Sequence, residues 1–258
     1  SAASDVYKRQ AIDHRQEAIR ELSTDLEYRQ QIRLLGLLYK GKPADTTEIK
    51  EWAASPSYYR KRTLLRILPI AVTVINFLCI SLAILGIISA NIAGGVFVSF
   101  VLFSTIFSKG ITKLQTTYGE KLQILSTYAD QILLTEQKEM HSHILQELKT
   151  DLTSQNQTAS QAVRQLSKLM NALDQRSNLL MSTILNGLIF WELRQVMRIE
   201  KWKEIHASDL PRWIETIGEI DAYCSLATFA YNHPDYIYPT IAAQSFHLQA
   251  EALGHPLM

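Results

Sequence analysis

Residues 67–108 form an uninterrupted segment without Asp, Glu, Lys, Arg or His. One membrane-crossing helix needs roughly 20 mostly apolar residues, so this segment has room for two crossings. Its midpoint, 89–95 (SANIAGG), carries turn-forming residues and no charge. The sequence therefore predicts a transmembrane helical hairpin over 63–109, with residues 89–95 at its tip.

Basic residues stand on both sides of this uncharged segment. Lys and Arg next to a membrane helix favour the cytoplasmic side, so both flanks and the rest of the chain are expected there. The alternative is a buried hairpin of a soluble protein, but buried helices rarely run beyond roughly 20 residues without an exposed charge. The flanking residues are Arg60, Lys61, Arg62 and Arg66 before the segment, and Lys109 and Lys113 after it.

Helical periodicity dominates before the hairpin. Residues 11–41 place apolar side chains three and four apart, which indicates two helical pieces joined near 23–25. A short helix is expected to follow, opened by Asp45 or Thr46 and stopped before Pro56.

The residues after the hairpin are also expected to be helical. Segments 117–137 and 140–152 carry the same spacing, and one uninterrupted helix of more than roughly 40 residues is predicted from Ser160. Within it, the apolar segment 179–191 is too short for a third crossing and favours a central buried helix. The first strand-like pattern lies at 235–251. The expected fold class is all-α, a long-helix core or lever bundle interrupted by the membrane hairpin.

No catalytic or cofactor motif is present in the sequence. It has no Gly-rich phosphate loop, no Walker-type lysine, no nucleophile elbow and no paired-cysteine metal spacing. His141 and His143 lie two apart on a predicted helix, hence on different faces, and do not indicate a metal site. Cys79 and Cys224 give no disulfide framework, which suits a reducing compartment. No catalytic, cofactor-binding or metal-binding residue is predicted within this chain.

Three basic residues, Arg194, Arg198 and Lys201, lie on neighbouring turns of one predicted helix face and are candidates for contact with DNA phosphates. Three acidic residues are interleaved with them, and a face of mixed sign is more often solvated or salt-bridged. The acidic residues are Glu192, Glu200 and Glu204. At most weak, sequence-independent contact with DNA is expected here.

The segment 229–239 (FAYNHPDYIYP) gathers aromatic residues around two prolines where the helical pattern ends. Proline restricts the backbone and aromatic rings pack well, so a stiff connector between domains is expected rather than a ligand site. Truncation of Tyr231 is expected to loosen this joint, at a large cost in stability if its ring is buried.

Segments 216–241 and 250–258 resemble the junction in MutS-family proteins where the helical core meets the ATPase domain. In that family an Asp-containing helix with a small-residue run leads to a Tyr-x-x-Pro-like segment and then to a His-Pro turn. Residues 12–22 are similar to the start of the MutS core, and 166–202 to membrane-anchored MutS-like proteins of bacteria. By this resemblance the joint to the ATPase domain comprises Asp221, Tyr231, Asn232, His233, Pro234, Tyr236, Pro239, His255 and Pro256.

The resemblance implies a fragment of an ATPase of the DNA mismatch repair family, located in the bacterial inner membrane. The native-length protein is then expected to bind ATP and Mg²⁺, to contact DNA and to form a homodimer, whereas the fragment holds no cofactor. No mismatch-reading domain with a wedge phenylalanine is recognised, and Tyr238 stands where soluble relatives are expected to carry a basic residue. Recognition of mismatches is therefore not expected.

The expected organisation has five parts. Residues 1–10 match a translated sequencing adapter, 11–62 and 110–235 form the two parts of the helical core and lever, 63–109 form the hairpin, and 236–258 form a connector and the beginning of a truncated α/β ATPase domain. The runner-up is a non-enzymatic membrane scaffold whose cytoplasmic helices bind a protein partner. A transporter fragment is disfavoured, since no charge or proline pair marks a mid-membrane site.

Overall fold

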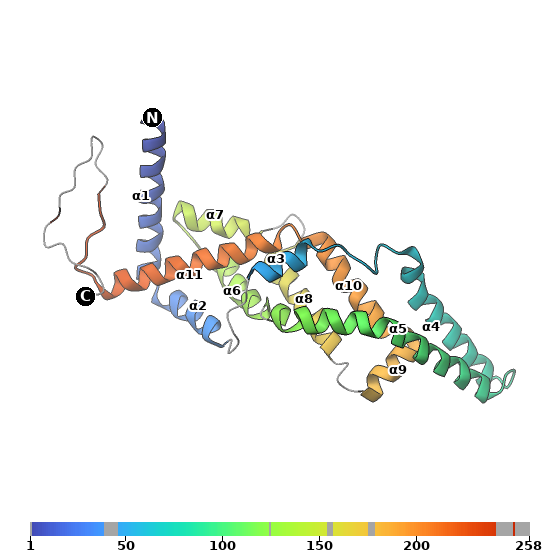
Figure 1. Cartoon of the computed structure of the whole chain (residues 1–258). Helices are drawn as coiled ribbons and strands as arrows, with labels where there is room; N and C mark the ends of the chain where they lie inside the picture. Colours follow the sequence, from blue (N-terminus) through green and yellow to red (C-terminus); the bar gives the residue numbers. More distant parts are fainter. Residues whose placement is uncertain are drawn as a thin grey trace.

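The computed structural model describes residues 2–38, 46–123, 125–153, 157–174, 179–240 and 250. It is an elongated helical molecule in which a bundle continues at one end into a projecting hairpin of α4 (Thr63–Ile84) and α5 (Ala90–Gln123) (Figure 1). The described residues contain no strand beyond one isolated bridge between Thr153 and Thr158. The all-α fold class is thus confirmed. Most of the expected beginning of an ATPase domain lies outside the described residues.

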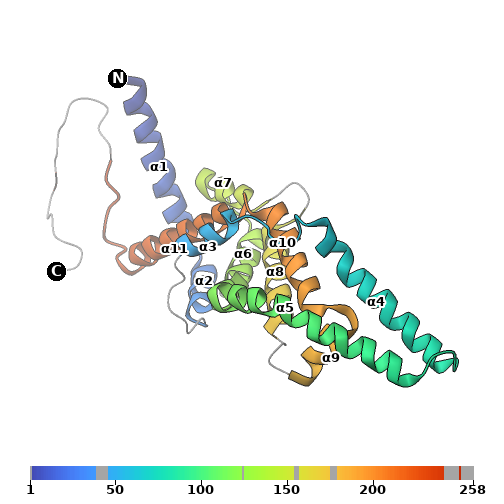
Figure 2. The ribbon, with the colours of Figure 1, turned by 45° about the vertical axis from the view of Figure 1, so that its right-hand side comes forward.

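The remaining helices form the bundle. α1 packs on α11 at the end opposite the hairpin (Figure 2), and α6 packs on α8. Their bounds are α1 Ala2–Thr24, α2 Leu26–Leu38, α3 Thr46–Ala54, α6 Leu125–Gln137, α7 His143–Asp151, α8 Ala159–Asp174, α9 Leu179–Ile189, α10 Trp191–His206 and α11 Leu210–Asn232.

The first helical segment divides at Asp25, as predicted. The Asp25 carboxylate accepts a hydrogen bond from the backbone N–H of Tyr28 at 3.0 Å and caps α2. α1 already begins at Ala2, so the segment 1–10, whose letters fit no helical period, belongs largely to this helix. α3 begins at Thr46 and ends before Pro56, which is also as predicted.

The hairpin turns at 85–89 rather than at the predicted 89–95. Gly86 adopts a φ of 73°, a left-handed conformation that glycine tolerates best, and this follows the end of α4. Residues 90–95 belong to the first turns of α5, so the predicted tip was several residues too late. α5 then continues to Gln123, beyond the expected end of the hairpin at residue 109.

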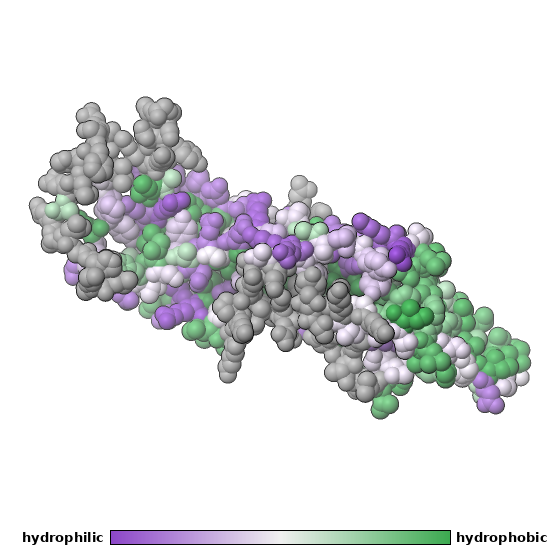
Figure 3. Space-filling model, viewed as in Figure 1, coloured by the Kyte–Doolittle hydropathy of each residue, from purple (hydrophilic) through white to green (hydrophobic). Residues whose placement is uncertain are grey.

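Both hairpin helices are long and apolar enough to cross a membrane, over Thr63–Ile84 and Ala90–Ser108. Only 17% and 0% of their most apolar windows are buried, whereas the core helix of a soluble protein would be mostly buried. Figure 3 shows the apolar surface that results at this end of the molecule. The exposure favours the membrane hairpin over the buried hairpin that the sequence had left as an alternative.

The single long helix predicted after the hairpin is wrong. The chain breaks between α9 and α10 at Phe190, whose φ of 51° and ψ of 52° are left-handed. This backbone is costly for a bulky residue, and three rings of α5 surround Phe190 and hold it there. The rings are those of Phe100, Phe103 and Phe107. Asn186 supports the break, because its Oδ1 accepts the backbone N–H of Glu192 at 2.9 Å.

The apolar segment that was expected to form a central buried helix does not do so. α9 packs one face on α5 and α4, but it leaves Leu180 79% and Ile184 48% exposed. The apolar composition of segment 179–191 predicted that the helix is shielded from water. It could not show which parts of the molecule would cover each of its faces.

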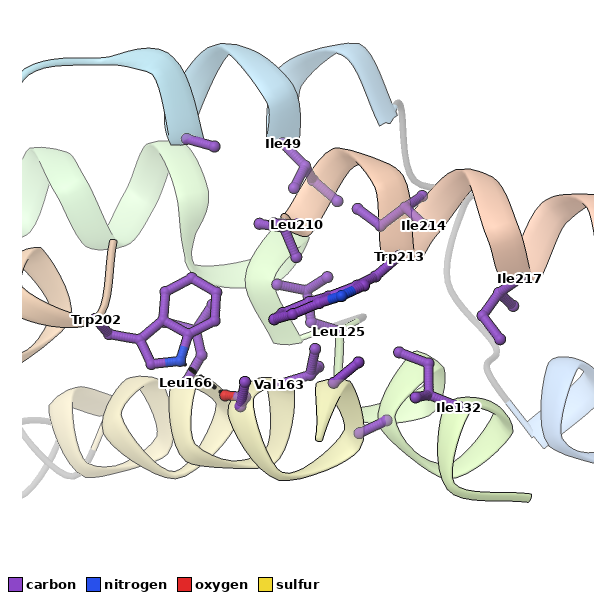
Figure 4. Packing of buried hydrophobic residues seen from close by; sticks show 14 of the residues in the cluster. Ile49, Leu125, Ile132, Val163, Leu166, Trp202, Leu210, Trp213, Ile214 and Ile217 are labelled. Atoms are coloured by element: carbon purple, nitrogen blue, oxygen red, sulfur yellow. Dashed lines mark hydrogen bonds between the residues drawn. The ribbon is translucent and has the colours of Figure 1, made fainter. Parts of the chain in front are cut away.

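The core of the bundle lies where α10 and α11 meet α8 (Figure 4). Trp202 of α10 and Trp213 of α11 both pack over α8, and the Trp202 indole N–H donates to the carbonyl of Ala162 at 2.8 Å. The bundle is therefore held by large rings at the turn that joins α10 to α11.

Candidate functional site

α10 connects the hairpin to the rest of the bundle. It contacts α4, α5 and α9 on the hairpin side and α8 within the bundle, and it leads into α11. Three of its side chains form hydrogen bonds with α4 and with the loop that precedes it. Arg194 binds within α4, Glu200 binds the loop just before α4, and Lys203 binds the end of α3. We call these three residues the coupling site.

Glu200 ties down the loop that enters α4. It is 5% exposed, and its Oε1 accepts the backbone N–H groups of Tyr58 at 2.7 Å and Tyr59 at 3.1 Å. Its Oε2 accepts the N–H of Arg60 at 2.6 Å. A carboxylate bonded to three backbone donors in this way holds residues 58–60 on α10. The acidic residues of this face were expected to be solvated or salt-bridged; Glu204, which pairs with Arg60, fits this, but Glu200 is buried against backbone N–H groups.

Lys203 binds the end of α3. It is 6% exposed, and its Nζ donates to the carbonyl of Ser55, just after α3, at 2.7 Å and to the carbonyl of Trp52, in the last turn of α3, at 3.4 Å. Burial lowers the pKa of Lys203, while the charges of Glu200 and Glu204 act against this shift. Together Lys203 and Glu200 fix both sides of the α3–α4 connection.

Arg194 reaches into the hairpin instead of facing outward with the other basic residues. Its Nη2 donates to the carbonyl of Pro69 at 2.9 Å and to Oγ1 of Thr73 at 2.7 Å. Its Nε donates to the carbonyl of Ile189 at 2.8 Å. Arg194 does lie one turn from Arg198 on α10, as predicted, but its guanidinium bonds α4 and is not directed outward with that of Arg198.

Arg198 and Lys201 do lie together, exposed, along a groove of about 950 Å³ between α7, α8, α10 and α11. Arg212 also lines it and pairs with Asp151. It is also lined by the rings of Trp202, His206 and Trp213, in which the His206 ring lies 5.0 Å from that of Trp202 and 5.7 Å from that of Trp213, tilted to both. The groove thus combines aromatic surface with charges of both signs, and contact of Arg198 and Lys201 with DNA stays a prediction.

At the far end of α11, three rings form one cluster. Phe229 and His233 lie 4.5 Å apart between ring centres, and Tyr236 lies 4.8 Å from His233. Two α1 side chains hold the chain that follows: Gln16 donates to the carbonyl of Pro239 at 2.9 Å, and the Arg20 guanidinium lies 4.5 Å from the ring centre of Tyr238. α1 and α11 thus share this joint.

The other joint candidates are less tightly packed. Tyr231 is 52% exposed and lies beside the guanidinium of Arg29, 4.9 Å from its ring centre, so the large stability cost of a buried ring does not apply to it. Exposed positions on or just after α11 are Asp221, Asn232 and Pro234, while His255 and Pro256 lie outside the described residues.

The predicted basic flanks meet at one end of the hairpin, since the Tyr59 hydroxyl lies next to Gly110 of α5. Arg62 stacks on the ring of Tyr58, and Arg60 bonds Glu204 at 2.6 Å, which lowers the pKa of that carboxyl. The other flanking positions are Lys61 and Arg66, both exposed, and Lys109 and Lys113 on α5.

Sequence reasoning missed Glu200 and Lys203 as structural anchors. A signal was available, because they follow Val196 and Ile199 by four residues and so share the apolar face of their helix. Among the described residues, no three His, Cys, Asp or Glu side chains are grouped to hold a metal ion.

Comparison of the chain with family models, curated proteins and solved structures found no match.

Proposed function

We propose that this chain is the membrane-anchored lever and core region of a MutS-like ATPase, which couples an ATPase domain to DNA or to a partner at the bacterial inner membrane. α4 and α5 would span the membrane, with both flanking helical regions in the cytoplasm. The exposed apolar hairpin and the basic residues at its one end support this arrangement.

The coupling site is the observation that carries the proposal. Glu200 bonds three consecutive backbone N–H groups before α4, and Arg194 bonds α4 from inside. A movement of α10 would therefore move α4 with it, because direct hydrogen bonds link the two. α11 extends from the same turn to the aromatic joint, which suits a rigid arm between two sites.

The chemistry would lie outside these residues. Phosphate binding needs consecutive backbone N–H groups in a Gly-rich turn together with a lysine. Gly94 and Gly95, an adjacent glycine pair, lie within α5 and have no lysine beside them in sequence. The native-length protein would bind ATP and Mg²⁺ and act as a homodimer.

A nucleotide titration tests this assignment, with the chain 1–258 and the native-length protein measured side by side in detergent. We expect Mg²⁺-dependent ATP hydrolysis by the native-length protein and no saturable ATP binding by 1–258. A native-length protein without hydrolysis would contradict the proposal. Any DNA binding should prefer a mismatched duplex by less than about tenfold, or roughly 1.4 kcal/mol, and should weaken as salt rises.

Cysteine labelling in intact cells tests the topology. In a background with Cys79→Ser and Cys224→Ala, Asn91→Cys near the hairpin tip should react with an impermeant thiol reagent. Ser208→Cys, on the turn between α10 and α11, should react only after lysis. Labelling of Ser208→Cys in intact cells, or of Asn91→Cys only after lysis, would contradict cytoplasmic flanks.

The second candidate is a membrane scaffold that binds a protein through the groove beside α10. Its mixed charges and aromatic rings favour this interpretation, since a phosphate backbone would meet the carboxylates of Asp151 and Asp209 there. Sequencing the native gene beyond Met258 separates the two. A Gly-rich loop ending in Gly-Lys-Ser or Gly-Lys-Thr supports the ATPase, and its absence supports the scaffold.

A further inference from the structure

α9 presents an apolar face that no other described element covers. Leu180 and Ile184 are 79% and 48% exposed, although the opposite face of the helix packs on α5 and α4. This exposed face adjoins the apolar surface of the hairpin rather than the polar surface of the bundle.

The contact between α9 and the hairpin is close. A Cβ atom on Gly187 would lie 2.5 Å from Cγ2 of Val101 and against the ring of Phe97. Only glycine allows α9 to approach α5 at this distance, as small residues do between membrane helices. α9 is therefore seated on the hairpin and does not merely pass beside it.

Two helices independently locate this contact along the hairpin. Asn76 of α4 donates to the carbonyl of Gly187 at 2.9 Å, and it lies nine residues after the uncharged segment begins at residue 67. Phe97 and Val101 of α5 lie 11 and 7 residues before the segment ends at 108. A helix rises about 1.5 Å per residue. Counted along α4 from residue 67 or along α5 from residue 108, Gly187 therefore lies roughly 14 Å from the basic end of the uncharged segment, which is about the middle of a 30 Å hydrocarbon layer.

The end of α9 also has the bonding that a helix end in lipid requires. Its last carbonyls lack helical partners, and each unsatisfied carbonyl is costly in hydrocarbon. The Asn76 amide donates to those of Gly187 and Leu188, and Arg194 donates to that of Ile189. A helix ending in water would need none of these three bonds.

The length of the segment decides how far it extends. Residues 177–191 carry no charge, which is about 15 residues and too short for a full crossing. We propose that α9 inserts into the membrane leaflet on the side of the basic flanks, as a third embedded element whose Leu180 and Ile184 contact lipid acyl chains. This inference rests on the proposed membrane insertion of α4 and α5.

Spin-label accessibility tests it on the full chain, reconstituted in vesicles of phosphatidylethanolamine and phosphatidylglycerol. Single labels replace Leu180 or Ile184 on α9, with Val98 on α5 as the membrane reference. Ile205 on α10 is the matched control, because it is also an isoleucine and is 56% exposed. Collisions with oxygen report lipid contact, and collisions with a water-soluble nickel chelate report contact with water.

We expect Leu180 and Ile184 to behave like Val98, with frequent oxygen collisions and few nickel collisions, and Ile205 to show the reverse. Nickel access at Ile184 equal to that at Ile205, with Val98 protected, would overturn the insertion of α9 and leave the hairpin intact. Nickel access at Val98 as well would overturn both proposals.

Discussion

α4 and α11 are helices of almost equal length, with 22 and 23 residues, yet they bury opposite kinds of surface. α11 buries Trp213 and Ile217 against the bundle and turns acidic residues outward. α4 exposes Leu64 at 80% and Phe77 at 57%, and buries Asn76 at 2%. Each helix is thus patterned for its own surroundings, which are the bundle core and water around α11 and, by our proposal, lipid around α4.

Buried polar groups have a common role in the two regions. Asn76 bonds the end of α9 near the hairpin, and Lys203 bonds the end of α3 in the bundle. In both regions the partners are backbone groups that helix geometry leaves unpaired, so such side chains are expected to matter more than exposed ion pairs.

The largest expected effect separates the two surfaces directly. Trp213→Ala, at a side chain 1% exposed, should lower the free energy of unfolding by about 3–5 kcal/mol. Phe77→Ala should change the free energy of unfolding by less than about 1 kcal/mol, because the exposed ring contacts detergent rather than protein and its removal leaves no cavity. Thermal unfolding followed by circular dichroism in detergent measures both. Equal losses would show that the hairpin surface is a protein core after all.

The coupling site should rank next. Glu200→Ala leaves three backbone N–H groups without their carboxylate and should cost about 2–3 kcal/mol in the same assay. Glu204→Ala is the control, since Glu204 is exposed and pairs only at the surface, and it should cost under about 1 kcal/mol. If the two variants unfold alike, α10 does not hold the loop as described.

A glycine pair tests the packing of α9. Gly187→Ala should destabilise by about 1–3 kcal/mol, because the added methyl meets Phe97 and Val101. Gly95→Ala, in α5 with open space around it, should be neutral or stabilising by up to about 1 kcal/mol. Tolerance of alanine at both positions would mean that α9 is not held closely on the hairpin.

Acidification should weaken the bundle at His206. Burial lowers the pKa of His206, so the unfolded chain takes up its proton first as pH falls. The contribution of neutral His206 to the free energy of unfolding is therefore present above the unfolded pKa of about 6.5, and it is lost as the pH falls below that value. His206→Phe should reduce the fall in Tm between about pH 7.5 and 5.5 by a few degrees. An unchanged pH dependence would assign the loss to other groups.

The smallest effect is expected at the joint. Tyr231→Ala removes a half-exposed ring and one contact with the guanidinium of Arg29, so stability should fall by less than about 1 kcal/mol. Chemical denaturation of the variant measures this. A loss as large as that of Trp213→Ala would contradict the half-exposed position of the Tyr231 ring.

Much of the fold could be predicted because several helices and their ends are marked by patterns of neighbouring residues. The charge-free segment predicted both hairpin helices, Asp25 marked the break between α1 and α2, and Pro56 marked the end of α3. The hairpin turn was predicted too late in the sequence, because residues 89–95 contain more turn-forming residues than the true turn around Gly86. The candidate site was predicted less well: of the three basic residues expected on one face, Arg198 and Lys201 line the groove, whereas Arg194 bonds α4.

Most helical segments could be recognised from the sequence, as could the segment long and apolar enough to cross a membrane, since helix periodicity and the absence of charge are properties of neighbouring residues. The direction of the Arg194 side chain, the helix break at Phe190 and the uncovered face of α9 could not be recognised in this way. Each of these depends on partners more than 80 residues away, such as Pro69 for Arg194 and Phe100 for Phe190. Contacts at that separation are set by the packing of whole helices, and no local pattern encodes them.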